Sequence, residues 1–159
     1  MKFKASFSNA VYAISAGCVV LFGVITYATL NNPDLLLPYQ LLIIGFLWVT
    51  FVVCWFLHST GYTVTADAVI IHRPLSKVTI LKSQITEVSQ PTEGDMKWTI
   101  RTFGVGGLFG YFGKFTNTAI GGMTWYATRR ENYVLLRLAN KRIILTPDEP
   151  KQFIAATGI

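Results

Sequence analysis

The chain has 159 residues, of which 52% are hydrophobic and only 14% are charged, and its formal net charge is +6. Soluble domains carry roughly 25% charged residues, so this composition is not that of an ordinary soluble domain. No helix-turn-helix or zinc-finger pattern accompanies the positive charge, so nucleic acid is not an expected partner. The two histidines and eight acidic residues form no catalytic or ligand spacing, so we expect neither an enzyme nor a bound metal or cofactor.

The shortage of charge is concentrated in the N-terminal third of the chain. Between Ala5 and Gly61 the only charged side chain is Asp34. Two uncharged stretches, at about residues 10–30 and 36–57, flank a proline-containing turn, and each has the roughly 20 apolar residues that a helix needs to cross a bilayer. We therefore predict a transmembrane helical hairpin within residues 1–60. The alternative for the first stretch is a cleaved signal peptide, but the stretch is long for a signal core and a second one follows at once.

Basic residues flank the predicted hairpin on one side only. Lys2 and Lys4 precede the first stretch, the region after the second stretch carries an excess of Lys and Arg, and the connecting turn has neither. The positive-inside rule therefore predicts a multi-pass membrane protein with both termini in the cytoplasm.

From residue 61 to residue 159 the pattern is that of a second, strand-rich domain. Alternating apolar and polar residues predict about seven antiparallel strands, two of them within residues 62–74 and the others at about 78–81, 85–88, 96–103, 133–138 and 141–146, and residues 123–128 are also rich in β-forming residues. In the 96–103 strand, this alternation would place Met96, Trp98, Ile100 and Thr102 on one face.

The C-terminal segment has the signature of a helix start. Thr146 can cap the helix, Pro147 suits its first position, and Glu149 would complete a capping box. A short helix is therefore expected to cover the strands.

The succession of these elements resembles the bacterial pleckstrin-homology-like (bacterial PH) domain proteins over roughly residues 60–157. The resemblance is carried by YTVTADAVIIHRP, ITEV, GLFGYFGKF and TWYATRRENYVLLRLANKRIILTPDEPKQFIAA, and it is most specific in residues 143–156. It implies a PH-like barrel of two roughly orthogonal antiparallel sheets capped by a C-terminal helix, preceded by a hairpin in the bacterial inner (cell) membrane. It does not imply a ligand, because PH-like folds bind lipids, proteins or peptides.

The stretch GLFGYFGKF, residues 107–115, is the least ordinary part of the domain. It is not a P-loop, because Phe115 follows Lys114 and Leu108 stands at the position of the first glycine. It is not a dinucleotide-binding fingerprint, because Phe109 stands at the position of the last glycine. Either its aromatic residues pack on the domain or the hairpin, or they form an apolar tip at the bilayer. The candidate contacts for a lipid or a partner are Leu108, Phe109, Tyr111, Phe112, Lys114, Phe115 and Arg101, joined by Arg129, Arg130, Lys141 and Arg142, which could equally be solvated edges.

The sequence as a whole indicates a membrane-anchored PH-like binding or scaffold module that engages a protein partner or anionic lipid at the inner membrane surface. A self-assembling membrane protein that forms homo-oligomers is the alternative. A transport subunit is less favoured because the apolar stretches contain no charge of the kind that marks ion pathways.

Overall fold

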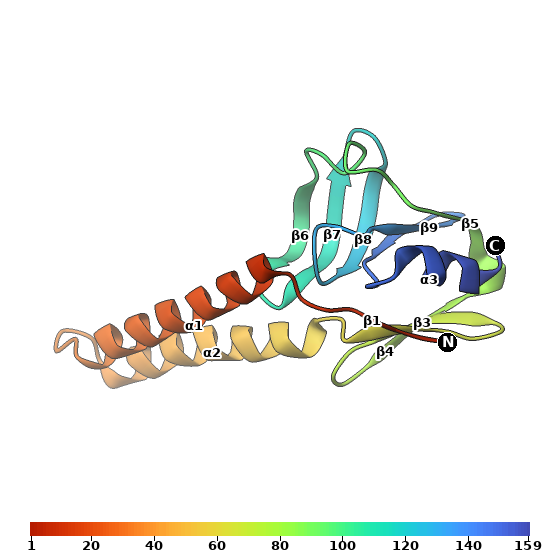
Figure 1. Cartoon of the computed structure of the whole chain (residues 1–159). Helices are drawn as coiled ribbons and strands as arrows, with labels where there is room; N and C mark the ends of the chain where they lie inside the picture. The colour runs from red at the N-terminus through yellow and green to blue at the C-terminus, as the bar shows by residue number, and fades with distance from the viewer.

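The computed structural model describes all of residues 1–159 and shows a long helical hairpin that projects from a β-rich domain (Figure 1). The hairpin consists of α1 (Asn9–Leu30) and α2 (Leu37–Leu57). Both helices are long and apolar enough to cross a membrane by length and composition. The two long apolar helices predicted from the sequence are therefore confirmed.

Polar side chains hold the hairpin at its start, its middle and its tip. The Ser8 hydroxyl accepts a hydrogen bond from the backbone N–H of Val11 at 3.3 Å and so caps α1. Trp48 Nε1 donates to Thr26 Oγ1 at 3.1 Å across the two helices. At the tip, the Gln40 amide donates to two backbone carbonyls of the connecting turn, at 2.9 and 3.1 Å. The only strongly polar residue of the second apolar stretch thus closes the turn.

The domain contains ten strands in two sheets. The first sheet has the order β1-β2-β3-β4, and the second has the order β5-β9-β10-β8-β7-β6. The strand bounds are β1 Lys2–Lys4, β2 Gly61–Val64, β3 Ala68–His72, β4 Lys77–Leu81, β5 Ile85–Ser89, β6 Ile100–Gly107, β7 Gly110–Asn117, β8 Gly121–Ala127, β9 Val134–Leu138 and β10 Arg142–Leu145. Neighbouring strands are antiparallel, except that β10 runs parallel to β8.

Two features of the predicted barrel are wrong. There are ten strands instead of about seven, and the sheets do not close into a barrel. One extra strand is β1, which precedes the first helix and pairs with β2, with Phe3 opposite Tyr62. The segment before α1, which the sequence-based division assigned to the hairpin, therefore joins the sheet of the domain.

Another extra strand comes from the glycine-rich stretch, which forms the β6–β7 hairpin. The strand predicted at 96–103 begins only at Ile100, so the predicted common face is not formed: Met96 is buried while Trp98 is exposed and has a positive φ of 55°. Gly104 faces Gly113 across the two strands, and a Cβ on Gly113 would lie 2.3 Å from the carbonyl oxygen of Phe103. Glycine is thus required here by the close approach of two backbones.

The predicted C-terminal helix is present as α3 (Pro150–Thr157), but it starts later than the sequence suggested. Pro150 occupies the first turn, and Glu149 is the capping residue without a side-chain hydrogen bond, so the capping box is not formed. Phe153 is fully buried and packs edge-on against Phe3 at 5.1 Å and near Tyr62 at 6.0 Å. The helix therefore covers the core between the two sheets.

Each face of the larger sheet has its own core. One face packs against the smaller sheet and α3, with Tyr62 donating a 2.6 Å hydrogen bond to the carbonyl of Tyr126; burial raises the pKa of Tyr62 to about 12. The other face buries Trp125, which stacks on Phe115 at 4.6 Å, under the segment that leads to β6 and the first turn of α1. The strands β6–β8 extend beyond the smaller sheet, toward α2.

Candidate functional site

The β6–β7 turn, Leu108–Phe109, lies against both helices of the hairpin. The Phe109 ring packs edge-on against Phe51 at 4.8 Å and Trp55 at 4.9 Å. Its backbone N–H donates to Ser15 Oγ on α1 at 3.0 Å. Phe109 has a φ of 55°, which is sterically costly for a residue with a side chain, so the contacts with the helices must outweigh that cost. The turn is therefore a structural joint between domain and hairpin.

The aromatic residues of the glycine-rich stretch are mostly packed inside the protein. Phe109, Tyr111, Phe112 and Phe115 are buried, and Leu108 is half-buried. Of the two sequence-based alternatives, the structure shows packing on the domain and the hairpin. These four rings are consequently not a free surface for a ligand.

A second joint ties the segment before α1 to the domain through Asp148. The backbone N–H and the hydroxyl of Ser6 donate to the Asp148 carboxylate at 2.9 and 2.6 Å, and Arg129 forms an ion pair with it. Partial burial raises the pKa of Asp148, but the Ser6 hydrogen bonds and the charges of Arg129 and Lys4 outweigh this and hold the pKa below its ordinary value. Arg129 is thus engaged within the fold, while Arg130 lies over the Tyr111 ring at 5.6 Å.

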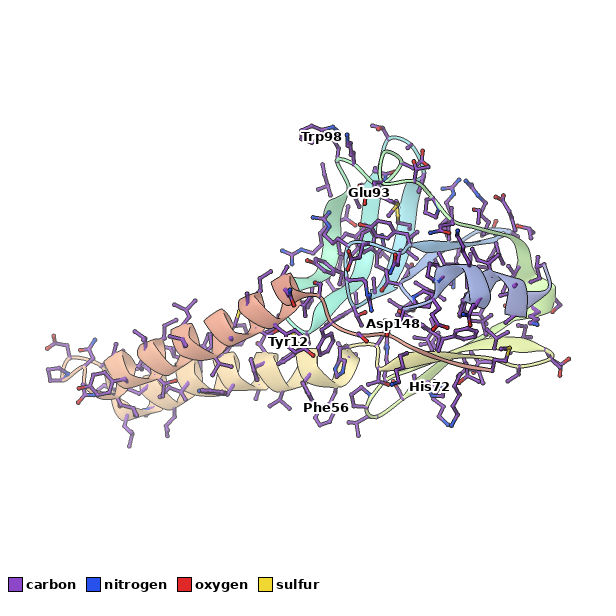
Figure 2. All side chains as sticks on the ribbon, in the orientation of Figure 1. Tyr12, Phe56, His72, Glu93, Trp98 and Asp148 are labelled. Atoms are coloured by element: carbon purple, nitrogen blue, oxygen red, sulfur yellow. The ribbon has the colours of Figure 1, made fainter.

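The strand β6 forms an open edge of the larger sheet and carries exposed apolar side chains. Trp98, just before the strand, is 87% exposed, and Ile100 and Phe103 are 66% and 75% exposed. Arg101 is also exposed between them. Figure 1 shows β6 running across the direction of the helices, on the side of the sheet from which they project. Trp98 lies at the end of the strand far from the hairpin (Figure 2).

Sequence reasoning missed the exposed apolar residues of this edge. Regular alternation placed Trp98 and Ile100 together on a face with Met96, and nothing in that pattern shows that the strand starts at Ile100 and has no neighbour on one side. The only available signal was the unusual combination of Trp98 and Phe103 with Lys97 and Arg101 within a few residues.

Beside this edge, an apolar hollow of about 520 Å³ separates α2 from the sheet. Its walls come from the second half of α2, including Phe46, Val49 and Val53, and from Phe103 and Val105 on β6. Arg73 also lines it, with its guanidinium 4.9 Å from the centre of the Tyr126 ring, and the Arg73 Nε has no hydrogen-bond partner. We call this space the apolar hollow.

A second hollow of about 500 Å³ continues along the same face of β6–β8 and shares Thr124 with the first. Three exposed cations surround it: Lys114 of β7, Lys141 of the β9–β10 turn and Arg142 of β10. None of the three has a carboxylate within 4.0 Å, because the ion pairs of the protein are Arg129–Asp148 and Arg137–Glu87. We call this space the cationic hollow, and the two hollows together the trough.

The structure thus divides the predicted contact residues into three groups. Lys114, Lys141 and Arg142 are brought together around the cationic hollow. Arg101 lies apart from them on the open edge. Arg129 pairs with Asp148, Arg130 lies over the Tyr111 ring, and the aromatic residues pack within the protein. Arg73, which sequence reasoning did not select, joins the site because the β3–β4 turn reaches α2.

Two apolar helices joined to a domain of two β-sheets and a C-terminal helix define a class, that of PH-like domains carried on a helical hairpin. The family model described as the bacterial PH domain matches residues 60–157, so the chain belongs to the bacterial PH domain family. No curated protein and no solved structure matches the chain. PH domains are in general non-catalytic binding modules. The open edge and the trough are therefore the candidate binding surfaces of this chain.

Proposed function

We propose that this protein is a membrane-anchored binding module whose PH-like domain engages anionic lipid at the cytoplasmic surface of the inner membrane. The helices α1 and α2 span the bilayer, both termini lie in the cytoplasm, and the domain binds without catalysing a reaction. The basic flanks of the hairpin support this orientation. The pairing of β1 with β2 supports an even number of spans, because it requires the segments before α1 and after α2 to be on the same side of the membrane.

The observation that carries the proposal is the composition and direction of the open edge of β6. With the helices upright in a bilayer, this strand runs along the membrane surface. Trp98 is then at the level of the headgroups, where Trp and Tyr are enriched, and the exposed apolar ring of Phe103 lies on the same strand. Arg101 and Lys97 beside them each gain about 1 kcal/mol near an anionic surface. In bulk water the same exposed apolar edge would be an aggregation site.

The test places a fluorescent probe on this edge in the full-length protein. A Trp98→Cys variant, with both native cysteines replaced by alanine, is labelled with an environment-sensitive fluorophore and reconstituted in nanodiscs. We expect a blue-shifted probe that brominated lipids quench, with stronger quenching when the lipid is anionic. A probe at Lys151→Cys on α3 is the control and should report water. Equal water-like signals at both positions would refute the proposal.

Self-association is a second candidate function, and the open edge of β6 favours it too. The eight residues of β6 pair with β7 on one side only, and an unpaired strand edge is a template for a second copy. Cysteine crosslinking at Thr102 in native membranes distinguishes the two candidates. A dimer that dilution with excess lipid does not dissolve would support pairing of copies, and a monomer throughout would exclude it.

A further inference from the structure

We infer that the trough between α2 and the β6–β8 face holds a single anionic phospholipid from the cytoplasmic leaflet, with an acyl chain in the apolar hollow and the phosphate in the cationic hollow. This inference deepens the proposed function and rests on it, because the apolar hollow is supplied with lipid only when α2 spans the bilayer. It differs from the proposed surface contact in naming one bound molecule and the residues that hold it.

The apolar end of the trough has the chemistry of a bilayer interior. One wall is the face of α2 that carries Phe46, Val49 and Val53, all of them exposed. In a membrane this face is covered by acyl chains, and the hollow is continuous with it. The opposite wall, Phe103 and Val105, is also apolar, so an acyl chain that enters between the walls loses no hydrogen bond.

The other end of the trough has the chemistry of a phosphate site. Lys114, Lys141 and Arg142 bring three positive charges to one hollow without a carboxylate to neutralise them. The hydroxyl-bearing residues Thr102 and Thr116 line it as well. Lysine and arginine bind phosphate oxygens through short, charge-assisted hydrogen bonds. Arg73, whose Nε has no partner, is not part of this end but lines the apolar hollow.

Only an amphipathic anion satisfies both ends at once. A free phosphate would leave the apolar walls uncovered, and an apolar helix of a partner would leave the cations unpaired. A second copy of this chain is also a poor fit, because each copy has a net charge of +6 and the cationic hollow of one copy would repel the other. The two hollows, of about 520 and 500 Å³, each fall within the roughly 300–1,000 Å³ range typical of ligand sites.

The test is native mass spectrometry of the full-length protein in mild detergent with added phosphatidylglycerol, which is anionic, or phosphatidylcholine, which is zwitterionic. The charge variant is Lys114→Gln with Arg142→Gln; both residues are exposed, so the fold should tolerate the change. Its control is Lys151→Gln on α3. The variant that blocks the apolar hollow is Val49→Trp, and its control is Val20→Trp on α1, an exposed residue outside the trough.

We expect one phosphatidylglycerol to remain bound to the wild type and to both controls, and retention to fall about tenfold in both trough variants. Equal retention in all proteins would overturn the inference. Loss in the charge variant alone would also overturn it, because it would show a headgroup site without an acyl chain. A protein crosslinked into the trough in native membranes, with no lipid retained after purification, would overturn it in favour of a protein partner.

The probe at position 98 separates this inference from the proposed function. If the two trough variants retain wild-type amounts of phosphatidylglycerol, the trough inference fails. If the probe at position 98 still senses lipid in them, the surface contact stands. If the probe reports water while the trough variants still lose bound lipid, the surface contact fails and the trough remains.

Discussion

The glycine pair at the centre of the β6–β7 hairpin allows a sharp prediction for Gly113→Ala. Gly113 has a φ of 121°, and its added Cβ would stand 2.3 Å from the carbonyl oxygen of Phe103. The backbone conformation alone costs an alanine about 1–3 kcal/mol. The clash is with the backbone of the paired strand, so relieving it disrupts β6–β7 hydrogen bonds worth about 1 kcal/mol each. We expect a total destabilisation of about 3 kcal/mol or more.

The assay is thermal unfolding of the full-length protein in nanodiscs, followed by tryptophan fluorescence. For a domain of this size a loss of about 3 kcal/mol corresponds to a fall in Tm of roughly 12 °C or more. Gly122→Ala on the neighbouring strand is the matched control, because its Cβ would meet nothing within 4 Å. If both variants unfold within about 3 °C of each other, the close approach of the strands is not what requires glycine at position 113.

Three further predictions concern the two joints and the first strand. Phe109→Ala removes a buried ring and should lower the free energy of unfolding by about 3 kcal/mol. Ser15→Ala removes one hydrogen bond and should lower it by about 1 kcal/mol. Thermal unfolding measures both variants, and equal losses of stability would contradict the structure. Because the pKa of Asp148 is lowered in the folded protein, its contribution to stability is complete at neutral pH and is lost as the pH falls through that lowered pKa. Asp148→Asn should therefore flatten the acid side of a plot of Tm against pH, and an unchanged plot would show that the contacts of the Asp148 carboxylate with Ser6 and Arg129 do not stabilise the protein. Phe3→Ala should destabilise the domain by about 3 kcal/mol, measured by the same unfolding; a neutral effect would mean that the first strand is not part of the domain core.

The sequence predicts those elements whose pattern is local. The helices of the hairpin follow from the absence of charge, and β2 to β5 follow from short-range alternation. It does not predict β1, because three residues carry too little pattern and their partner lies some sixty positions later. It does not predict the β6–β7 hairpin either, because glycine normally argues against a strand. Here glycine is needed only because Gly104 and Gly113 face each other, which the structure alone reveals.

The same limit applies to the candidate site. Lys114, Lys141 and Arg142 attract attention as cations, but only the pairing of β8 with β7 and β10 brings them around one hollow. Arg129 looks equivalent in the sequence, yet Asp148 neutralises it. The aromatic side chains of the glycine-rich stretch look like a binding tip, but α1 and α2 supply a place for Phe109 to pack.

The pairing of β1 with β2 makes the whole helical hairpin an oversized loop between two adjacent strands. If α1 and α2 span the bilayer as proposed, the first strand leaves the ribosome well before its partner and cannot pair until both helices have been inserted. A chain that inserted only one helix would have the two strands on opposite sides of the bilayer, and its sheet could never be completed. Under the proposed topology, completion of the smaller sheet therefore depends on the insertion of both helices.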